Sequence, residues 1–261
     1  MVLFITNDLN FVLPPYIFFA CLGATFSISM NIVLLYLKKC NFQRNFKLLL
    51  LTIPFILIFA KVFGYLSGVY NAIGNGERIT LETIKETGIV YYGGLFGLML
   101  SYDIATKKVN KNNKQEMDIL AVSIPLFHIF GRIGCYFSGC CYGKEFNGRG
   151  SVLYTTVING IENISYRIPV QLIEATFNLF LFIYLLFLSF KNDWESEQLL
   201  KKYLLIYSAG RFCLEFFRGD ESRGVINGLS FSQFISVVVF TFVLMKIFYI
   251  KMKRGINYVD Y

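Results

Sequence analysis

Charged residues are scarce in this chain. Asp, Glu, Lys and Arg make up 16% of its 261 residues, while hydrophobic residues make up 55% and aromatic residues 18%. Ordinary soluble domains contain about 25% charged residues, so this supply of charge excludes a fold whose whole surface faces water. Several apolar runs approach the roughly 20 residues needed to cross about 30 Å of hydrocarbon, which indicates a polytopic membrane protein.

Other common signals are also missing. The sequence contains no internal repeat, low-complexity tract or inserted soluble domain, so we predict one membrane domain over residues 1–261, with a non-cytoplasmic loop at about 138–169. The first thirteen residues contain no Lys or Arg. A cleaved secretory signal normally has a basic n-region, so the first apolar span is expected to stay in the protein.

Seven apolar spans predict an all-α fold of seven transmembrane helices. The spans lie near Tyr16–Leu37, Leu48–Val69, Gly88–Ile104, Ile119–Phe137, Val170–Phe190, Tyr203–Phe217 and Gly228–Tyr249. The third and sixth spans are short and carry glycine or charge. Helices that line a polar cavity have this composition.

The positions of Lys and Arg predict the orientation. Fifteen of them lie in the connections after the first, third and fifth spans and in the C-terminal tail, and seven lie in the other connections. Cytoplasmic loops carry the excess of basic residues, so the N-terminus is expected outside and the C-terminus in the cytoplasm. This bias also accounts for the net charge of +8, which suits an anionic leaflet, and no nucleic acid is expected as a partner.

Three basic residues, Lys61, Arg132 and Arg211, fall inside spans and are not counted above, whereas Lys246, close to the inner end of the last span, is counted with the tail. A charge at the bilayer centre costs about 2.5–3.5 kcal/mol on insertion scales, so such a residue normally faces the bundle interior and has a partner. For Lys61, a structural ion pair, a snorkelling side chain and a functional role all stay open.

Polar side chains gather around the two arginines at helical spacing. The three stripes contain Tyr207, Arg211, Glu215 and Arg218 in the sixth span, His128, Arg132 and Cys135 in the fourth, and Gln171, Glu174 and Asn178 in the fifth. The predicted topology brings these stripes together in the outer half of the membrane. Tyr91 and Tyr92 open the third span on the same side, followed by Gly93 and Gly94, which permit close backbone approach or a break in the helix.

This set of side chains suits a phosphate-bearing lipid at headgroup depth. Guanidinium groups match the oxygens of a phosphate group, and Glu174 and Glu215 would orient the arginines or act as general bases. On these residues alone, a transporter built on charge pairs is an alternative.

The six cysteines form two groups. Three are expected to be inert fillers or loop residues: Cys21, Cys40 and Cys213. Cys135, Cys140 and Cys141 cluster near the predicted outer mouth, with a spacing unlike the CxxC pairs of zinc sites, so no metal and no cofactor is predicted. A disulfide, for example between Cys135 and Cys140, and a reactive thiolate beside Arg132 both stay open.

Several segments resemble one known family. They are GRIGCYFSGCCYG from Gly131, PVQLIEA from Pro169, RFCLEFFRGD from Arg211 and GLSFSQ from Gly228. Together they resemble the prolipoprotein diacylglyceryl transferase family over nearly the whole chain. The resemblance implies a seven-helix enzyme of the bacterial cytoplasmic membrane with its site facing the outer leaflet. It also implies transfer of a diacylglyceryl group from phosphatidylglycerol to the lipobox cysteine thiol of a prolipoprotein, with release of glycerol phosphate.

The resemblance, together with the polar stripes that contain His128 and Arg218, also implies residue roles. Arg132 matches the signature arginine, Gly143 its closing glycine, and Asp118 has the expected spacing before Arg132. The predicted catalytic residues are Arg132, Arg211, Tyr207, Glu215 and His128. The predicted substrate-binding residues are Tyr92, Gly93, Gly94, Cys135, Gly143, Gln171, Glu174 and Arg218. In this mechanism the arginines bind the headgroup and stabilise the leaving phosphate, the tyrosines position the lipid, and His128 or Glu215 helps to deprotonate the thiol.

The sequence departs from the family pattern at specific positions. Tyr92 stands where the family has histidine, Cys135 and Ser138 where it has asparagines, and Cys140 where it has glutamate. The changes at Tyr92 and Cys135 favour a second hypothesis, the same lipid donor with a glycan or small-molecule acceptor. A third hypothesis is a membrane thiol-redox protein or transporter. His128, one turn before Arg132, is either a replacement for the missing base or a packing histidine.

Overall fold

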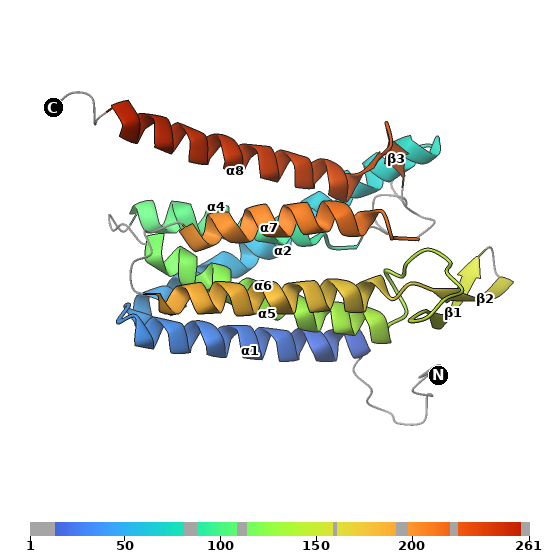
Figure 1. The fold of residues 1–261 in the computed structure, drawn as a ribbon, viewed down its shortest axis with the longest axis horizontal. Helices are drawn as coiled ribbons and strands as arrows, with labels where there is room; N and C mark the ends of the chain where they lie inside the picture. Colours follow the sequence, from blue (N-terminus) through green and yellow to red (C-terminus); the bar gives the residue numbers. More distant parts are fainter. Residues whose placement is uncertain are drawn as a thin grey trace. The chain divides into compact units, whose positions relative to one another are not determined.

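The computed structural model describes residues 14–80, 88–108, 114–158, 161–191, 198–219 and 224–256. Within these residues the chain forms seven α-helices and two small two-stranded sheets (Figure 1). The helices are α1 (Pro15–Leu37), α2 (Phe42–Asn75), α4 (Tyr91–Lys108), α5 (Lys114–Phe137), α6 (Val170–Phe190), α7 (Gln198–Glu215) and α8 (Phe231–Ile256). Each helix overlaps one predicted span, and the all-α prediction is confirmed.

Among the described residues, five helices are long and apolar enough to cross a membrane: α1, α2, α5, α6 and α8. The exposed side chains support the same conclusion, because Phe180 and Phe187 of α6 are exposed whereas Glu174 and Asn178 of that helix are buried. An apolar exterior around a polar interior requires lipid as the solvent. The chain is therefore a multi-pass membrane protein.

Seven crossings with the N-terminus outside remain a prediction. The remaining two helices, α4 and α7, have 18 residues each and carry the glycines and charges noted in the third and sixth spans. Lys85, Lys111 and Arg223, three of the loop cations that support the orientation, lie outside the described residues.

The chain divides into two compact units. The first comprises Met1–Val33 and Ile119–Glu221, and the second comprises Leu34–Asp118 and Ser222–Tyr261. The first unit therefore contains most of α1 and α5, all of α6 and α7, and the hairpin of β1 (Val152–Ile158) and β2 (Ile161–Arg167). Its helices bring together all three predicted polar stripes.

In the first unit, α1 packs closely on α5 because small residues and stacked rings alternate along the contact. Gly23 lies against Phe127 and Phe130 of α5, where a Cβ atom would have almost no room. The rings of Phe26 and Phe130 stack at 5.1 Å between centroids, and the Ser27 hydroxyl donates to the carbonyl of Ser123 at 2.8 Å. Small residues let membrane helices approach in this way.

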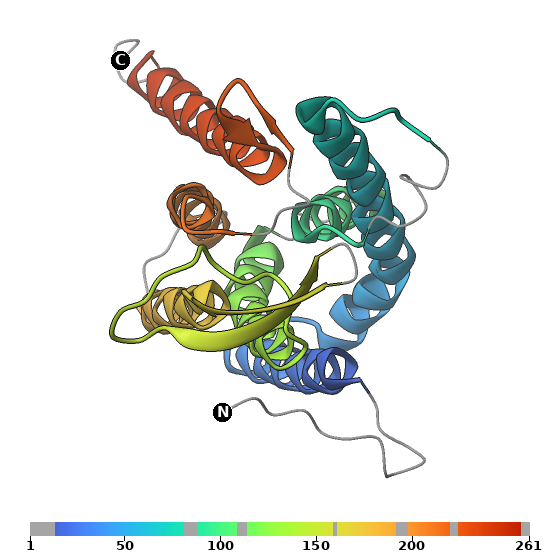
Figure 2. The ribbon, with the colours of Figure 1, turned by 90° about the vertical axis from the view of Figure 1, so that its right-hand side faces the viewer.

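The loop after α5 joins three elements through backbone hydrogen bonds. Gly143 N–H donates to the carbonyl of Ile168 at 3.0 Å, Lys144 N–H donates to Phe217 at 2.9 Å, and Gly219 N–H donates to Tyr142 at 3.1 Å. These bonds hold the loop against the start of α6 and the end of α7, and the hairpin lies over the ends of α5 and α6 (Figure 2). The loop after α5 and the hairpin thus form a rim at the end of the helices that carry the polar stripes.

Gly143 was predicted to contact substrate, but its place in the structure is explained by close packing of its backbone against Ile168 and Val170. A Cβ atom on it would overlap the carbonyl oxygen of Ile168 and the side chain of Val170. We expect Gly143→Ala to lower the free energy of unfolding by about 1–3 kcal/mol, as overpacking does in tight cores. Thermal unfolding in detergent micelles measures this loss. Gly131→Ala is the matched control, because Gly131 is helical with open space around it, and a similar loss there would contradict the packing argument.

In the second unit, α4 packs against α2. Gly93 and Gly97 of α4 lie directly against the backbone of α2 at Phe59 and Phe55, which confirms the predicted close approach at Gly93 but not at Gly94. At its N-terminus α8 has a capping box, since Ser230 N–H donates to Gln233 Oε1 at 2.9 Å and Gln233 N–H donates to Ser230 Oγ at 3.3 Å. The short strands β3 (Val225–Ile226) and β4 (Leu229–Ser230) pair just before this cap.

Candidate active site

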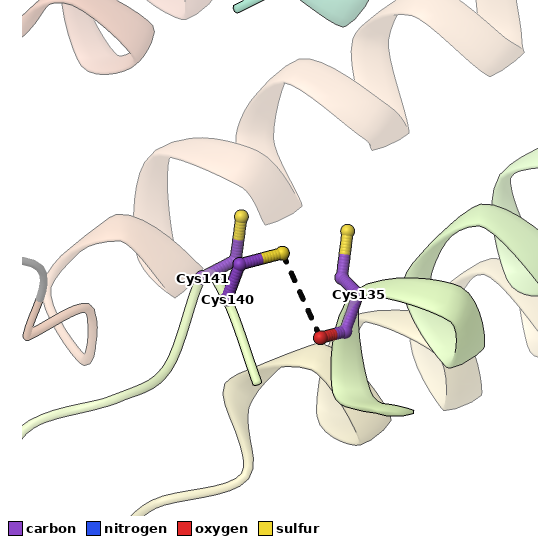
Figure 3. A group of neighbouring side chains, drawn as sticks. All are labelled: Cys135, Cys140 and Cys141. Carbon is purple, nitrogen blue, oxygen red and sulfur yellow. Dashed lines mark hydrogen bonds between the residues drawn. The ribbon is translucent and has the colours of Figure 1, made fainter. Parts of the chain in front are cut away.

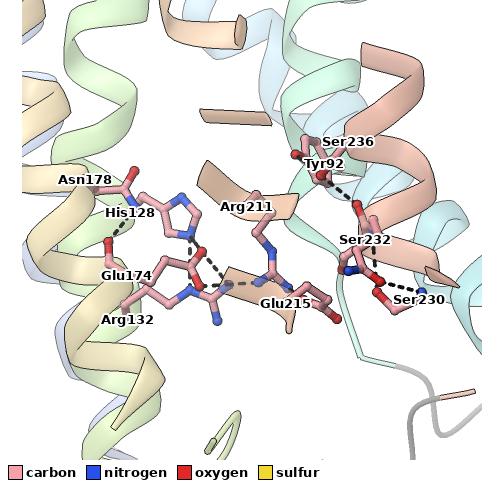
Figure 4. Close-up of polar contacts among 11 residues, drawn as sticks. Tyr92, His128, Arg132, Glu174, Asn178, Arg211, Glu215, Ser230, Ser232 and Ser236 are labelled. Atoms are coloured by element: carbon pink, nitrogen blue, oxygen red, sulfur yellow. Dashed lines mark hydrogen bonds and ion pairs between the residues drawn. The ribbon is translucent and has the colours of Figure 1, made fainter. Parts of the chain in front are cut away.

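A single buried carboxylate lies at the centre of the polar residues of the first unit. Glu174 of α6 has no exposed surface, and three basic side chains reach it from two other helices (Figure 4). Its Oε1 lies 2.9 Å from Arg132 Nη2 and 3.3 Å from His128 Nε2, and its Oε2 lies 3.6 Å from Arg211 Nη1. The stripes predicted on α5, α6 and α7 therefore meet at Glu174.

Helical spacing explains why each stripe reaches the same place. His128 and Arg132 are four residues apart on α5, so both project from one face of that helix. Arg211 and Glu215 have the same spacing on α7 and form an ion pair through Arg211 Nη2. On α6, Asn178 Nδ2 donates to the backbone carbonyl of Glu174 at 2.8 Å.

The formal charges of this cluster balance. Glu174 and Glu215 provide two negative charges, and Arg132 and Arg211 provide two positive charges. Buried charges are tolerated only when partners and hydrogen bonds offset their lost hydration. The side chain of Arg132 is 11% exposed and that of Arg211 is 5% exposed. Arg132 is thus the more accessible of the two guanidinium groups.

His128 takes part in two alternative contacts through one atom. Arg132 Nε donates to His128 Nε2 at 3.2 Å, and arginine is always a donor, so Nε2 carries no proton in that contact. The same nitrogen is 3.3 Å from Glu174 Oε1, a contact that a proton on Nε2 would turn into a charged hydrogen bond. His128 can therefore hold a proton beside Glu174 once Arg132 moves from it.

Two predicted residues, one on α7 and one just after it, lie next to this network. The ring of Tyr207 is 5.3 Å from the ring of His128 and stacks on Tyr203 at 5.6 Å between centroids. Arg218, just past the end of α7, is buried, and its backbone pairs with Gly143 in an isolated bridge. Tyr207 and Arg218 are thus fixed by α7 and by the segments next to it, close to the ion pairs.

Gln171 connects the network to the loop after α5. Its Nε2 donates to the carbonyl of Cys140 at 2.6 Å, and its Oε1 accepts from the hydroxyl of Tyr154 at 3.2 Å. Burial raises the pKa of Tyr154 to about 12, so this phenol stays a hydrogen-bond donor. The role of Tyr154 was not predicted, because its strand carries no motif and only the fold brings it to Gln171.

Another unpredicted contact lies at the rim. Arg167, assigned from sequence only to an outer connection, pairs with Glu145 at 3.0 Å and lies 4.7 Å over the ring of Tyr142. A basic residue in a predicted loop is the only signal that the sequence offers for it. Arg167, at the end of β2, thus connects the hairpin to the loop after α5.

The three clustered cysteines come together beside Arg132. Their sulfur atoms all lie within 4.8 Å of one another (Figure 3), and all six cysteines of the chain are free thiols. Hydrogen bonds with Cys135 and Cys141 raise the pKa of the Cys140 thiol, whereas hydrogen bonds with Cys135 and Cys140 lower the pKa of the Cys141 thiol. Cys141 is therefore the first of these two thiols to lose its proton.

The predicted residues at the start of the third span belong to the second unit. The Tyr92 hydroxyl lies 2.8 Å from Ser236 Oγ of α8, and Ser236 in turn donates to the carbonyl of Ser232 at 2.7 Å. Gly94 lies in ordinary contact with Ile56 and Ala60 of α2. Lys61, the third basic residue inside a span, lies 5.0 Å over the ring of Tyr65.

Comparison with known proteins agrees with the motifs. A protein-family model described as prolipoprotein diacylglyceryl transferase matches residues 8–249. Phosphatidylglycerol–prolipoprotein diacylglyceryl transferase of Clostridium tetani is 37% identical over 158 residues, which cover 60% of this chain and 62% of that protein. An enzyme of Clostridium perfringens with the same name, numbered 2, is 29% identical over 82% of this chain and 85% of its own length. One from Campylobacter lari is 31% identical over 76% of this chain and 71% of its own.

Proposed function

The chain belongs to the prolipoprotein diacylglyceryl transferase family, and we propose that it transfers the diacylglyceryl group of phosphatidylglycerol to the cysteine thiol of a prolipoprotein. The observation that carries this proposal is the buried cluster in which Glu174 holds Arg132 and Arg211. The cluster provides two guanidinium groups for a phosphate, in a membrane protein whose relatives are named for this reaction.

The reaction displaces a phosphate ester at carbon. The acceptor sulfur attacks the carbon of the diacylated glycerol that bears the phosphate. A carbon–sulfur bond forms there, and the bond between that carbon and the phosphate oxygen breaks. Glycerol phosphate leaves with an additional negative charge, and the thiol proton passes to a base. Stabilising the charge that develops on the phosphate oxygens is the main task of the site.

Arg132 is suited to bind the phosphate, because its guanidinium is the more exposed of the pair and forms bidentate bonds with phosphate oxygens. Arg211, held between Glu174 and Glu215, adds a second positive charge at a fixed position. Glu174 is a positioning residue that orients both arginines. Tyr207, packed on His128, would position the lipid.

We assign the base to His128 rather than to Glu215, which is already paired with Arg211. When Arg132 turns toward the phosphate, its Nε no longer donates to His128 Nε2, and this nitrogen can accept the thiol proton. Glu174 Oε1, 3.3 Å away, then stabilises the imidazolium. Binding of the lipid would thus free the base.

His128→Gln tests this assignment, because glutamine keeps a polar group of similar reach but cannot accept the proton. We expect turnover to fall about 10²–10⁴-fold, and the decline in rate at acidic pH caused by titration of the histidine to disappear. The measurement is the pH dependence of kcat/KM. A variant with full turnover and an unchanged pH profile would make His128 a packing residue.

The proposed function is tested by release of glycerol phosphate. Purified full-length protein in phosphatidylglycerol vesicles is incubated with and without a lipobox peptide, and we expect release only with the cysteine-containing peptide. Arg132→Ala should lose it, whereas Arg149→Ala, an exposed loop arginine, should retain it. No release with the peptide would contradict the proposal.

A second candidate function keeps the lipid donor but uses a glycan or small-molecule acceptor. It is favoured by Tyr92, Cys135 and Cys140, which replace the family residues at these positions. Release of glycerol phosphate that does not depend on the peptide but depends on another added acceptor would support it. Family membership makes either transferase the first function to test, before a thiol-redox protein or a transporter.

The proposal includes an orientation. Seven helices would cross a bacterial cytoplasmic membrane with the site facing the outer leaflet, supported by the excess of basic residues in the predicted cytoplasmic connections. A membrane-impermeant amine reagent should then label Lys144 from outside intact cells and should not label Lys39, since both side chains are exposed. The opposite labelling pattern would reverse the orientation.

A further inference from the structure

The geometry points to a three-thiolate zinc site formed by Cys135, Cys140 and Cys141, with its fourth coordination position open to the acceptor thiol. The inference that zinc binds depends only on the geometry of the cysteine cluster. The role of the fourth position rests on the proposed function. This inference replaces the prediction of no metal, which considered only the spacing of the cysteines along the sequence.

The end of α5 brings the first two thiols together. Cys140 N–H donates to the carbonyl of Cys135 at 3.2 Å and Gly139 N–H donates to that of Tyr136 at 3.2 Å, the two bonds of a Schellman motif. Gly139, at φ 68°, supplies the left-handed residue that this motif requires. The motif folds Cys140 back over the turn that contains Cys135.

The third thiol arrives through an unusual backbone conformation. Cys141 has φ 62°, a region that residues other than glycine rarely occupy and that often marks functional sites. Figure 3 shows its sulfur on the same side as the sulfurs of Cys135 and Cys140. Two left-handed residues within three positions thus bring the sulfurs of three cysteines together.

The spacing of the sulfurs matches the size of a zinc ion. The three atoms lie within 4.8 Å of one another, whereas zinc–sulfur bonds of about 2.3 Å place tetrahedral ligands about 3.8 Å apart. Small side-chain rotations can bring the sulfurs together by this difference. A set of three sulfur ligands favours zinc over the hard cations, which select oxygen.

Neighbouring side chains stabilise the loop that carries the cysteines and offset the negative charge of such a site. Gln171 Nε2 holds the Cys140 carbonyl at 2.6 Å, as outer hydrogen bonds do around metal ligands. Three thiolates on Zn²⁺ carry a net charge of −1, and Arg218 and Arg132 lie close enough to Cys141 to act on its charge. Cys135 is buried and Cys140 is exposed, so a fourth ligand can approach from the open side.

That fourth ligand can take part in the reaction. An acceptor thiol binds zinc as a thiolate, and its proton would pass through water to His128, because Cys135 lies about two helical turns from His128 on α5. The bound sulfur would then lie beside Cys135, one helical turn from Arg132, which would bind the phosphate. The sulfur then forms its bond to the glycerol carbon as the phosphate leaves. The product is a neutral thioether, a weaker ligand than a thiolate, and it can depart from the metal.

Metal binding is tested first and does not depend on activity. We expect full-length protein purified under reducing conditions to contain one zinc ion per chain and to bind Co²⁺ with a thiolate-to-cobalt absorption band. Cys140→Ser with Cys141→Ser should weaken Co²⁺ binding roughly 100-fold or more. Cys21→Ser with Cys213→Ser, two exposed cysteines elsewhere, should leave it unchanged.

Three results would overturn the site: no bound metal, a cobalt band that persists in the cluster variant, or a disulfide among the three cysteines in the purified protein. Thermal unfolding of the cluster variant separates loss of ligands from loss of fold. If that variant is unfolded, Cys140→Ser alone, at an exposed position, is used and should still lower Co²⁺ affinity.

The role of the fourth position is tested with peptides. A lipobox peptide containing cysteine should change the cobalt spectrum, and the same peptide with serine should not. If neither peptide changes the spectrum, the proposed place of the acceptor is wrong. A change with the cysteine peptide but no release of glycerol phosphate would support the site and contradict the proposed transferase.

Discussion

Glu174→Gln is expected to lower turnover about 10²–10³-fold and to destabilise the protein by about 3–5 kcal/mol. The substitution removes the carboxylate that both arginines and His128 share, so two guanidinium groups remain buried with a single acid. Thermal unfolding in micelles should show a fall in melting temperature on the order of 10 °C, and glycerol phosphate release gives the turnover.

The control for this prediction is Glu145→Gln. Glu145 pairs with Arg167 at 3.0 Å but its side chain is 60% exposed, and exposed ion pairs contribute about 0–1 kcal/mol. Both variants remove one ion-paired carboxylate of the first unit. A similar loss in both would show that burial of Glu174 is not the cause.

A double variant separates stability from catalysis. Glu174→Gln combined with Arg211→Gln removes one charge of each sign, and we expect its melting temperature to recover part of the loss. Turnover should not recover, because the positioning of Arg132 and one cation are both lost. Recovery of turnover together with stability would mean that Glu174 acts only through the fold.

The second large effect is expected for Arg132→Lys. Lysine keeps the positive charge but has a single donor group in place of the planar guanidinium, so it cannot form the bidentate bonds with two phosphate oxygens. We expect kcat/KM to fall about 10²–10³-fold, as when one donor to a developing oxyanion is lost. The measurement is the rate of glycerol phosphate release over a range of phosphatidylglycerol content in the vesicles.

Arg149→Lys is the matched control, because it makes the same substitution at an exposed loop position. It should have no effect on kcat/KM. Unchanged catalysis in Arg132→Lys would remove bidentate phosphate recognition from the mechanism and would leave Arg132 as a charge that balances Glu174.

The helices and the polar stripes were predictable because both follow from local rules. Lipid requires long apolar helices, and α6 begins and ends at the residues predicted, Val170 and Phe190. Residues four apart share a helix face, so the pairing of His128 with Arg132 could be predicted before the fold was known. The buried charges pointed to partners because isolated charges are costly in a membrane.

The partners themselves were decided by the tertiary structure. Several acids were available to the arginines, and only packing of α5, α6 and α7 selects Glu174 as the acid that His128, Arg132 and Arg211 share. The contact between Tyr154 and Gln171 also joins separate elements, and no periodicity along the chain encodes such a contact.

The sequence by itself determined the membrane class, the helices and the face on which each polar residue lies, because these depend on composition and on the 3.6-residue period. Only the tertiary structure decided the hub at Glu174, the packing that requires Gly143 and the meeting of the three thiols. Two left-handed residues, Gly139 and Cys141, turn the chain back on α5. The distance between sulfur atoms depends on those backbone angles and not on the number of residues between the cysteines.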